Sequence, residues 1–136
     1  MINGAKIIRD YLLTQAGVTA LTGTRIYAER DVPPAGYKPS DGACICFQTR
    51  GGAPDLYSKV LSASVQCTCW APASSTQRAE VQCNTLYRAL FDALDTGGGS
   101  VVRYGYLEGL GQTLWHPESG WPFVLCAFRL MLNNQE

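Results

Sequence analysis

The chain has 136 residues, a length that suits one domain over 1–136, with a hydrophobic core that needs neither disulfides nor metal. Hydrophobic residues make up 46% of the chain and charged residues 16%, which excludes a disordered protein and favours a surface partly hidden in an assembly. Lys and Arg together number 11, as do Asp and Glu, so the net charge of zero gives no sign of a dedicated nucleic-acid binder.

The N-terminal quarter predicts helical structure followed by a long loop. Apolar residues recur on one side of a helix over 7–13, and Gly17 is its predicted end. One further short helical turn is expected at 18–21, and a short strand at 24–28. Three prolines and two glycines over 31–42 predict a surface excursion without regular structure.

Two strands are predicted in the middle of the chain. The segment 43–50 is apolar on both faces in its first half, which indicates a central place in the sheet. The segment 61–70 alternates apolar and polar residues, which is typical of a strand with one buried face. A loop over 51–58 joins them, and as neighbours in sequence they are expected to pair antiparallel.

A long helix follows the strand 61–70, and the two are expected to bury their apolar surfaces against each other. Its predicted apolar stripe consists of Ala79, Cys83, Leu86, Leu90 and Leu94. Ser74, Ser75 or Thr76 is the predicted N-cap, and the glycines at 97–99 end the helix.

The last third predicts two strands. The first covers 101–108 and continues at 110–115, and Gly105 inside it suggests a bulge or a close backbone approach. The second, at 121–132, is apolar on both faces except for Arg129, so it lies deep in the sheet or packs against another subunit. The expected fold is therefore α+β, in the order α-β-β-β-α-β-β, with helices on one face of a largely antiparallel sheet.

The cysteines are interpreted as core residues. They are Cys44, Cys46, Cys67, Cys69, Cys83 and Cys126. No window of about 18 apolar residues and no signal-peptide core is found, so we expect folding in a cytosol, where thiols stay reduced. Residues i and i+2 of a strand share a face, so both C-x-C pairs fit buried positions. A metal site is the alternative, and it is disfavoured because structural zinc sites more often use C-x₂₋₄-C on tight turns.

Few other side chains could carry chemistry. His116 is the one histidine and stands before a proline in a turn, so an exposed turn residue is favoured over a general base. Arg25, Arg50 and Arg103 are interpreted as surface charges, with a nucleic-acid channel as the alternative. Neither a catalytic residue nor a cofactor is expected, and a small soluble enzyme or thiol protein is a disfavoured alternative, because a thiol on a core face is inert.

A family resemblance is spread over nearly the whole chain. The stretches that carry it are 18–27, 32–34, Cys44-Ile45-Cys46-Phe47, 62–70, Leu86-Tyr87 with Leu90, Tyr106-Leu107-Glu108 and Phe123-Val124-Leu125. In the order and spacing of these stretches the chain resembles the tail-terminator, or tail-completion, proteins of long-tailed bacteriophages. Other neck and head-tail completion proteins share its size, and a small oligomeric interaction module is a further alternative.

The resemblance implies structural work in a virion. Such proteins form a hexameric ring on the last ring of the tail tube, end tube polymerisation and offer a joining surface to the head-tail connector protein, while DNA later passes through the lumen. The implied location is the tail or neck of the virion, after assembly in the host cytoplasm without a membrane. The residues expected to contact other subunits or the tube are Arg50, Asp55, Leu56 and Tyr57 of the second loop and Arg129, Leu130 and Leu132 of the last strand.

Overall fold

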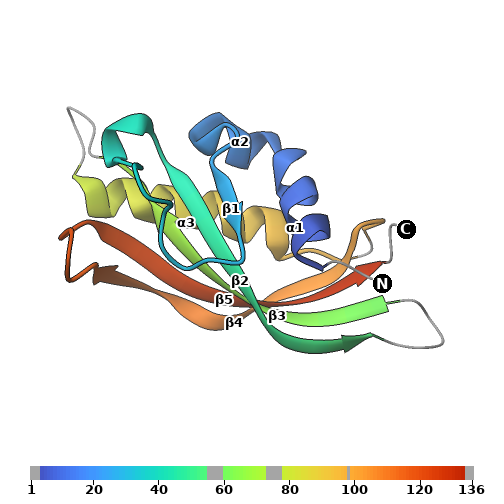
Figure 1. The fold of residues 1–136 in the computed structure, drawn as a ribbon. Helices are drawn as coiled ribbons and strands as arrows, with labels where there is room; N and C mark the ends of the chain where they lie inside the picture. Colours follow the sequence, from blue (N-terminus) through green and yellow to red (C-terminus); the bar gives the residue numbers. More distant parts are fainter. Residues whose placement is uncertain (1–3, 55–59, 73–77, 98, 134–136) are drawn as a thin grey trace.

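The computed structural model describes residues 4–54, 60–72, 78–97 and 99–133, and the strands within these ranges form one mixed sheet. The helices are α1 (Gly4–Leu13), α2 (Ala16–Thr22) and α3 (Ala79–Leu94), and a single 3-10 turn covers Pro39–Asp41. The strands are β1 (Ile26–Ala28), β2 (Cys44–Pro54), β3 (Val60–Trp70), β4 (Val102–Trp115) and β5 (Pro122–Asn133). All three helices lie on one face of the sheet (Figure 1), so the predicted α+β class is confirmed. In the ranges described, no helix combines the length and the apolar character needed to cross a membrane.

The sheet has the strand order β1-β2-β3-β5-β4. Strand β1 pairs with β2 in parallel, and every other neighbouring pair is antiparallel. The predicted antiparallel pairing of the two middle strands is therefore confirmed. Strand β5 pairs with β3 on one side and β4 on the other, so of the two places predicted for it, the structure shows the one deep in the sheet.

The main core lies between the sheet and α3. The helix buries the predicted stripe, with Ala93 added to it and Ala79 half-buried. Opposite it, β5 buries Val124, Cys126, Phe128, Leu130 and Leu132. Helix α1 joins this core through Ile8 and Leu12, and the Tyr11 hydroxyl donates a hydrogen bond of 2.8 Å to the Ala93 carbonyl. The long helix thus covers β3 as predicted, and it lies across β5 and β4 as well.

Two predicted helix boundaries are wrong. The first helix ends at Leu13, and Gly17 lies inside α2, where a glycine near a helix start is tolerated. Helix α3 begins at Ala79 with Arg78 as its N-cap and no side-chain cap bond. The predicted caps at 74–76 lie outside the described residues. An ion pair of 3.1 Å between the exposed Arg78 and the half-buried Glu80 accompanies this helix start.

Of the two alternatives predicted for Gly105 in β4, the structure shows the close backbone approach, and the bulges of this strand lie on either side of it. The register of β4 against β5 shifts at three places, one of them between Val102 and Tyr104. A Cβ at Gly105 would collide with the Leu94 carbonyl oxygen, so the backbone approaches the end of α3 too closely for a side chain. Gly105 also exchanges two backbone hydrogen bonds with Thr96, of 2.8 and 3.1 Å. Further along β4, the Gly111 amide donates to the Tyr87 hydroxyl at 3.2 Å.

The helical face of α3 can be tested with two substitutions. Leu90 is fully buried and Arg88 is exposed. Leu90→Asp places a carboxylate in the core and is expected to cost several kcal/mol, enough to abolish soluble folding, whereas Arg88→Asp is expected to stay within about 0.5 kcal/mol. Urea unfolding followed by circular dichroism measures both values. A similar loss of stability in the two variants would contradict this assignment of faces.

A second pair of substitutions tests the close approach at β4. Gly105→Ala is expected to lower the free energy of unfolding by about 1–3 kcal/mol, because the added methyl group meets the Leu94 carbonyl. Gly17→Ala is the matched control, since a Cβ at Gly17 meets nothing within 4 Å and alanine favours the helix by about 0.5–1 kcal/mol. Opposite signs in thermal unfolding are the expected result, and a stable Gly105→Ala protein would refute the clash.

Candidate assembly surface

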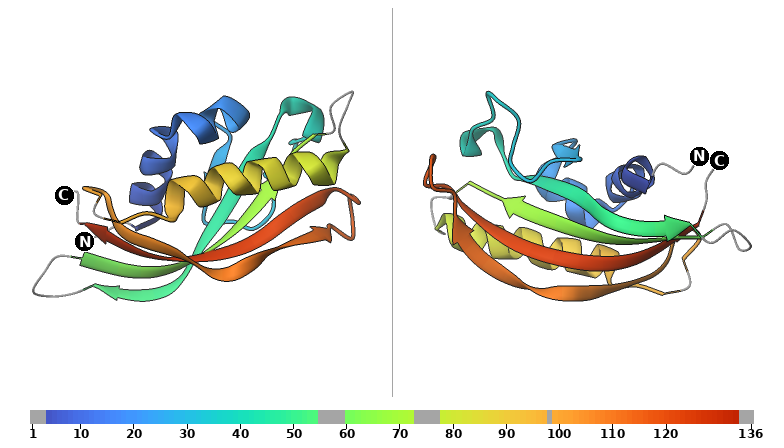
Figure 2. Two further views of the ribbon diagram at one scale, coloured as in Figure 1. Left: turned by 180° about the vertical axis from the view of Figure 1, so that it is seen from behind. Right: turned by 60° about the horizontal axis from the view of Figure 1, so that its bottom comes forward.

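The face of the sheet away from the helices is open over much of its area (Figure 2, right). Tyr104 and Tyr106 of β4 stand on this face, because Gly105 between them points toward the helices. The two tyrosines are 56% and 52% exposed, and Met131, the cross-strand partner of Tyr104, is 40% exposed. We call these three residues the tyrosine patch. Tyr and Met are enriched at protein interfaces, so this patch is a candidate contact surface.

A polar cluster borders the tyrosine patch. Arg129 of β5 is the register partner of both Tyr106 and Ser64, so it points out of the sheet. Its Nε lies 4.0 Å from a Glu108 carboxylate oxygen, and the Ser64 hydroxyl donates to the other oxygen at 2.5 Å. Both charged side chains are more than a third exposed, so this ion pair adds little stability and its charges can still meet a partner.

Two predicted contact residues belong to the core instead. Leu130 and Leu132 have no exposed surface and lie beneath the helices. Their side chains are therefore not available to a neighbouring subunit in this fold. Side chains on a strand alternate between the faces, and the odd-numbered residues of β5 are those that reach the open face. Among the three predicted residues of β5, Arg129 alone is accessible there.

The segment around Arg50 is more regular than predicted. Residues 51–54 were expected in a loop, yet they continue β2 and pair with β3 after a register shift between Thr49 and Gly52. Five residues therefore separate the two strands, a length within the ordinary range for a hairpin, so excess loop length gives no argument for a role. Arg50 lies in β2, whereas Asp55, Leu56 and Tyr57 lie outside the described residues.

The opposite end of the open face is covered by its own small core. Cys44, Cys46 and Trp70 are buried there, with Tyr37 of the 31–42 loop packed over them. His116 lies at the edge of this cluster, with its ring centroid 5.9 Å from that of Trp70. Its Nδ1 accepts a hydrogen bond of 3.3 Å from the Ser119 amide, so the imidazole stabilises its own turn. His116 begins the predicted turn, but its predicted exposure is wrong, because the residue is half-buried.

The arginines interpreted as surface charges differ in their surroundings, and one of them bonds to the backbone. Arg25 donates from its Nε to the Ala43 carbonyl at 2.9 Å and so ties β1 to the start of β2. Arg9 makes the same kind of bond, of 2.9 Å, to the Ile26 carbonyl. Arg103 is exposed at the start of β4. Arg25 therefore serves the fold, which leaves Arg103 and Arg129 as exposed charges on the last two strands.

All six cysteines are buried and unpaired, which confirms their interpretation as core residues. Cys67, Cys69, Cys83 and Cys126 lie under the helices, and Cys44 and Cys46 lie on the other side of the sheet. Burial raises the pKa of the Cys83 thiol to about 11, so it stays protonated and unreactive near neutral pH. Within the described ranges, no three His, Cys, Asp or Glu side chains are grouped so that they could hold a metal ion.

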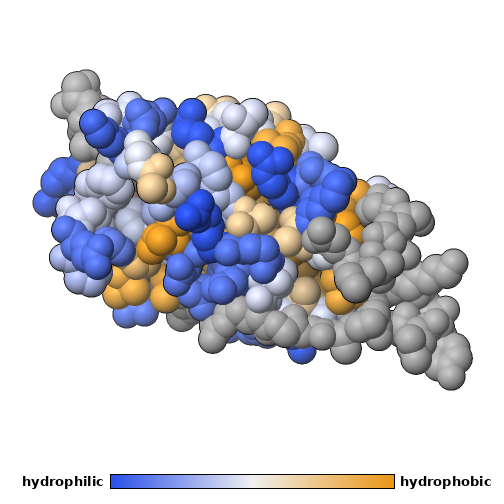
Figure 3. All heavy atoms as spheres, in the orientation of Figure 1, coloured by the Kyte–Doolittle hydropathy of each residue, from blue (hydrophilic) through white to orange (hydrophobic). Residues whose placement is uncertain are grey.

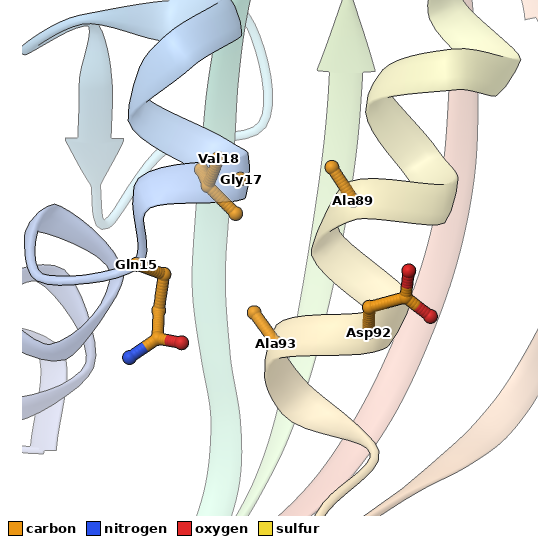
Figure 4. A pocket seen from close by; sticks show the side chains of 6 residues that line it. All are labelled: Gln15, Gly17, Val18, Ala89, Asp92 and Ala93. Carbon is orange, nitrogen blue, oxygen red and sulfur yellow. The ribbon is translucent and has the colours of Figure 1, made fainter.

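Two hollows open on the helical side. The first lies between α2 and α3, has a volume of about 150 Å³ and is lined by the residues in Figure 4. The small side chains Ala89 and Ala93 form its wall on α3, and Asp92 lies at its rim. The second, which we call the α1 hollow, has a volume of about 220 Å³ and is lined by Lys6, Ile7, Asp10, Tyr11, Thr14 and Val101. Its wall is mainly apolar, and Figure 3 shows apolar side chains among hydrophilic ones over α1.

The exposed tyrosines were missed by sequence reasoning, which used this segment as a strand and as part of the family resemblance and not as a contact surface. A signal was present, because Tyr104 and Tyr106 flank a glycine at a spacing of two and so share one face. The glycine itself was recognised as a close approach, and that fixes which face points inward. Together the two observations would have placed both rings on the open side of the sheet.

The buried thiols give a direct test of the two cores. In the folded protein, all six cysteines are expected to react with a thiol reagent far more slowly than a free thiol, because burial keeps the reagent away from the sulfur atoms. In denaturant without reductant, six thiols are expected to react per chain. Fast reaction of any cysteine in the native protein would show that one core is open, and fewer than six thiols after unfolding would show a disulfide.

Comparison with known proteins gives a structural match alone. No family model matches the chain, and no curated protein does. Among solved structures, a chain of the virion of a native gene transfer agent particle aligns with a TM-score of 0.59 and 19% sequence identity. The alignment covers 92% of this chain and 90% of that chain. This protein therefore shares its fold, over nearly its whole length, with a chain of that virion.

Proposed function

We propose that this chain is a structural protein of a phage-like virion, and that its copies form a ring at the head-proximal end of the tail tube. The ring ends tube polymerisation and provides the surface for head-tail joining. The observation that carries the proposal is the fold shared with a virion chain over 92% of this chain. The resemblance of its sequence pattern to tail-terminator proteins supports the more specific role.

The surface described above suits a protein that works by contact. Exposed aromatic and apolar side chains stand beside a small cluster of opposite charges, and the formal net charge of zero places no repulsion between copies. The proposed partners are other copies of the chain in a hexamer, the tail tube protein and the head-tail connector protein. DNA passes through the lumen without sequence-specific binding. The proposed role requires no catalytic residue or cofactor.

The β2–β3 hairpin is the proposed contact with a neighbouring subunit or the tube. Its strands run out past α1 at one end of the sheet (Figure 1). Arg50 lies within this extension, and Asp55, Leu56 and Tyr57 lie between the two strands in sequence. Segments that connect strands often carry binding residues, which supports a role of this hairpin in assembly.

Deletion of the gene from its phage or prophage tests the function. The expected result is tails of uncontrolled length that do not join heads, seen by negative-stain electron microscopy, with loss of infectious or transducing particles. Tails of normal length that fail to join would favour the alternative of a neck or connector completion protein. Normal particles from the deletion strain would exclude both roles.

Complementation of that deletion tests the hairpin. Replacement of Asp55-Leu56-Tyr57 by Gly-Ser-Gly is expected to leave thermal unfolding within a few degrees of the wild type and to abolish complementation. Glu118→Gln, in the exposed turn between β4 and β5, is the control and is expected to complement fully. Full complementation by the hairpin variant would remove the hairpin from the assembly surface, and a collapsed fold would place it in the core.

A further inference from the structure

The tyrosine patch and the α1 hollow lie on opposite faces of the sheet, near the start of β4. Val101 lines the hollow and directly precedes β4, and Tyr104 follows three residues later. Side chains of the patch project outward, whereas the hollow opens beside α1 on the helical side. Two surfaces on opposite faces of one chain cannot meet within that chain, but each can meet the other on a second copy.

The two surfaces match in chemistry. The hollow is walled by Ile7, Tyr11 and Val101, and its volume of about 220 Å³ is large enough to admit an aromatic side chain. The Tyr11 ring in its wall is held by the hydrogen bond of its hydroxyl to Ala93, so the hollow is preformed. On the patch, the Tyr104 ring lies beside Gly97, and Met131 is the register partner of Tyr104 on the neighbouring strand. Rigid aromatic anchors that enter preformed pockets carry much of the binding energy at interfaces.

Their charges match as well. The rim of the hollow carries Lys6 and Asp10, which form an exposed ion pair of 2.8 Å. The border of the patch carries Glu108 and Arg129, with a long contact of 4.0 Å. Each surface is neutral, so two copies do not repel each other, and each brings one acid and one base that can pair across the contact.

We propose that the tyrosine patch of one subunit docks into the α1 hollow of a second copy of this chain, and that this heterologous contact builds the ring. The proposal rests on the proposed function, and it names the residues that join the subunits. Because the two surfaces differ and lie on opposite faces, each added copy offers the same contact to the next one. The series ends only when the rotation between successive copies brings the last copy back to the first and closes a ring. A patch-to-patch contact would instead stop at a dimer.

Two variants that each remove one half of the contact provide the test. The patch variant combines Tyr104→Ser with Tyr106→Ser, both at exposed positions, and the hollow variant is Thr14→Trp, which fills the hollow from its exposed rim. Gln112→Ser, an exposed residue of β4 outside both surfaces, is the control. Analytical ultracentrifugation measures self-association of each purified full chain over a wide concentration range, and thermal unfolding confirms that each variant is folded.

The expected results are specific to a heterologous contact. Wild type and Gln112→Ser form closed oligomers, and each of the other two variants alone self-associates at least about tenfold more weakly. Mixed together, the patch variant and the hollow variant form a one-to-one complex and nothing larger, because the mixture contains one intact contact. That mixing result cannot arise from misfolding, since both chains must be folded to bind.

Three outcomes would overturn the proposal. If both variants oligomerise like the wild type, the subunit contact lies elsewhere while the ring itself stands. If the hollow variant alone forms a stable dimer, the patch binds another patch. If the wild type stays monomeric at every concentration, the two surfaces do not bind each other. A failure of the proposed function would appear separately, as normal particles from the deletion strain.

Discussion

The pairing of β5 on both edges, with α3 packed against one face, is the constraint on which the rest of the fold depends. Both β5 and β3 have long antiparallel partners on both sides in the described part of the chain, and β5 has the more extensive contact with the long helix. Its buried residues alternate strictly with half-buried or exposed ones, so each side chain is committed to the core or to the open face. A shift of one residue would exchange Phe128 with Arg129 and place a charge beneath the helix. The face on which the proposed contacts occur is therefore fixed by burial on the other face.

Much of this architecture could be predicted because the apolar period is strong where the core is thick. The alternation of 61–70 and the stripe of α3 are long and regular, and both are confirmed. The ends of the helices were harder to predict from the sequence. Gly17 was expected to end a helix, but the chain already breaks after Leu13, where Gln15 takes the position of the next N-cap. The predicted caps of α3 were plausible by residue type, yet local preference does not decide where a helix held by tertiary packing begins.

The candidate surface was predicted less well, and the reasons are physical. An apolar strand end has the same composition whether it faces a partner or the core. The pattern alone therefore could not show whether Leu130 and Leu132 lie in the core or at an interface. Both residues lie on the same face of β5 as Phe128, which places them in the core. That shared face became clear once the register with β3 and β4 was known. Arg129 was singled out because a charge in an apolar run is costly to bury. The glycines at 51–52 suggested a loop, but glycine is also tolerated at a bulge, and there it continues the strand.

The way β4 ends its sheet has a consequence for how the protein behaves in a crowded cell. An outer strand normally exposes a row of backbone donors and acceptors that any extended chain can join, which is a route to fibrous aggregates. In β4, the backbone groups of Gly105 are already hydrogen-bonded to Thr96, and the Gly111 amide is bonded to the Tyr87 hydroxyl. The register shifts also bend the strand, so it does not offer a flat edge to another chain. Newly made copies can then reach a high concentration without pairing through their strand edges. Contacts between copies depend instead on the shape of their side chains, and such contacts form wrong pairs more slowly and dissociate more easily than backbone pairing does. In the proposed ring, a misplaced subunit could then dissociate and bind again, which is the kind of error correction that an assembly with a fixed number of positions requires.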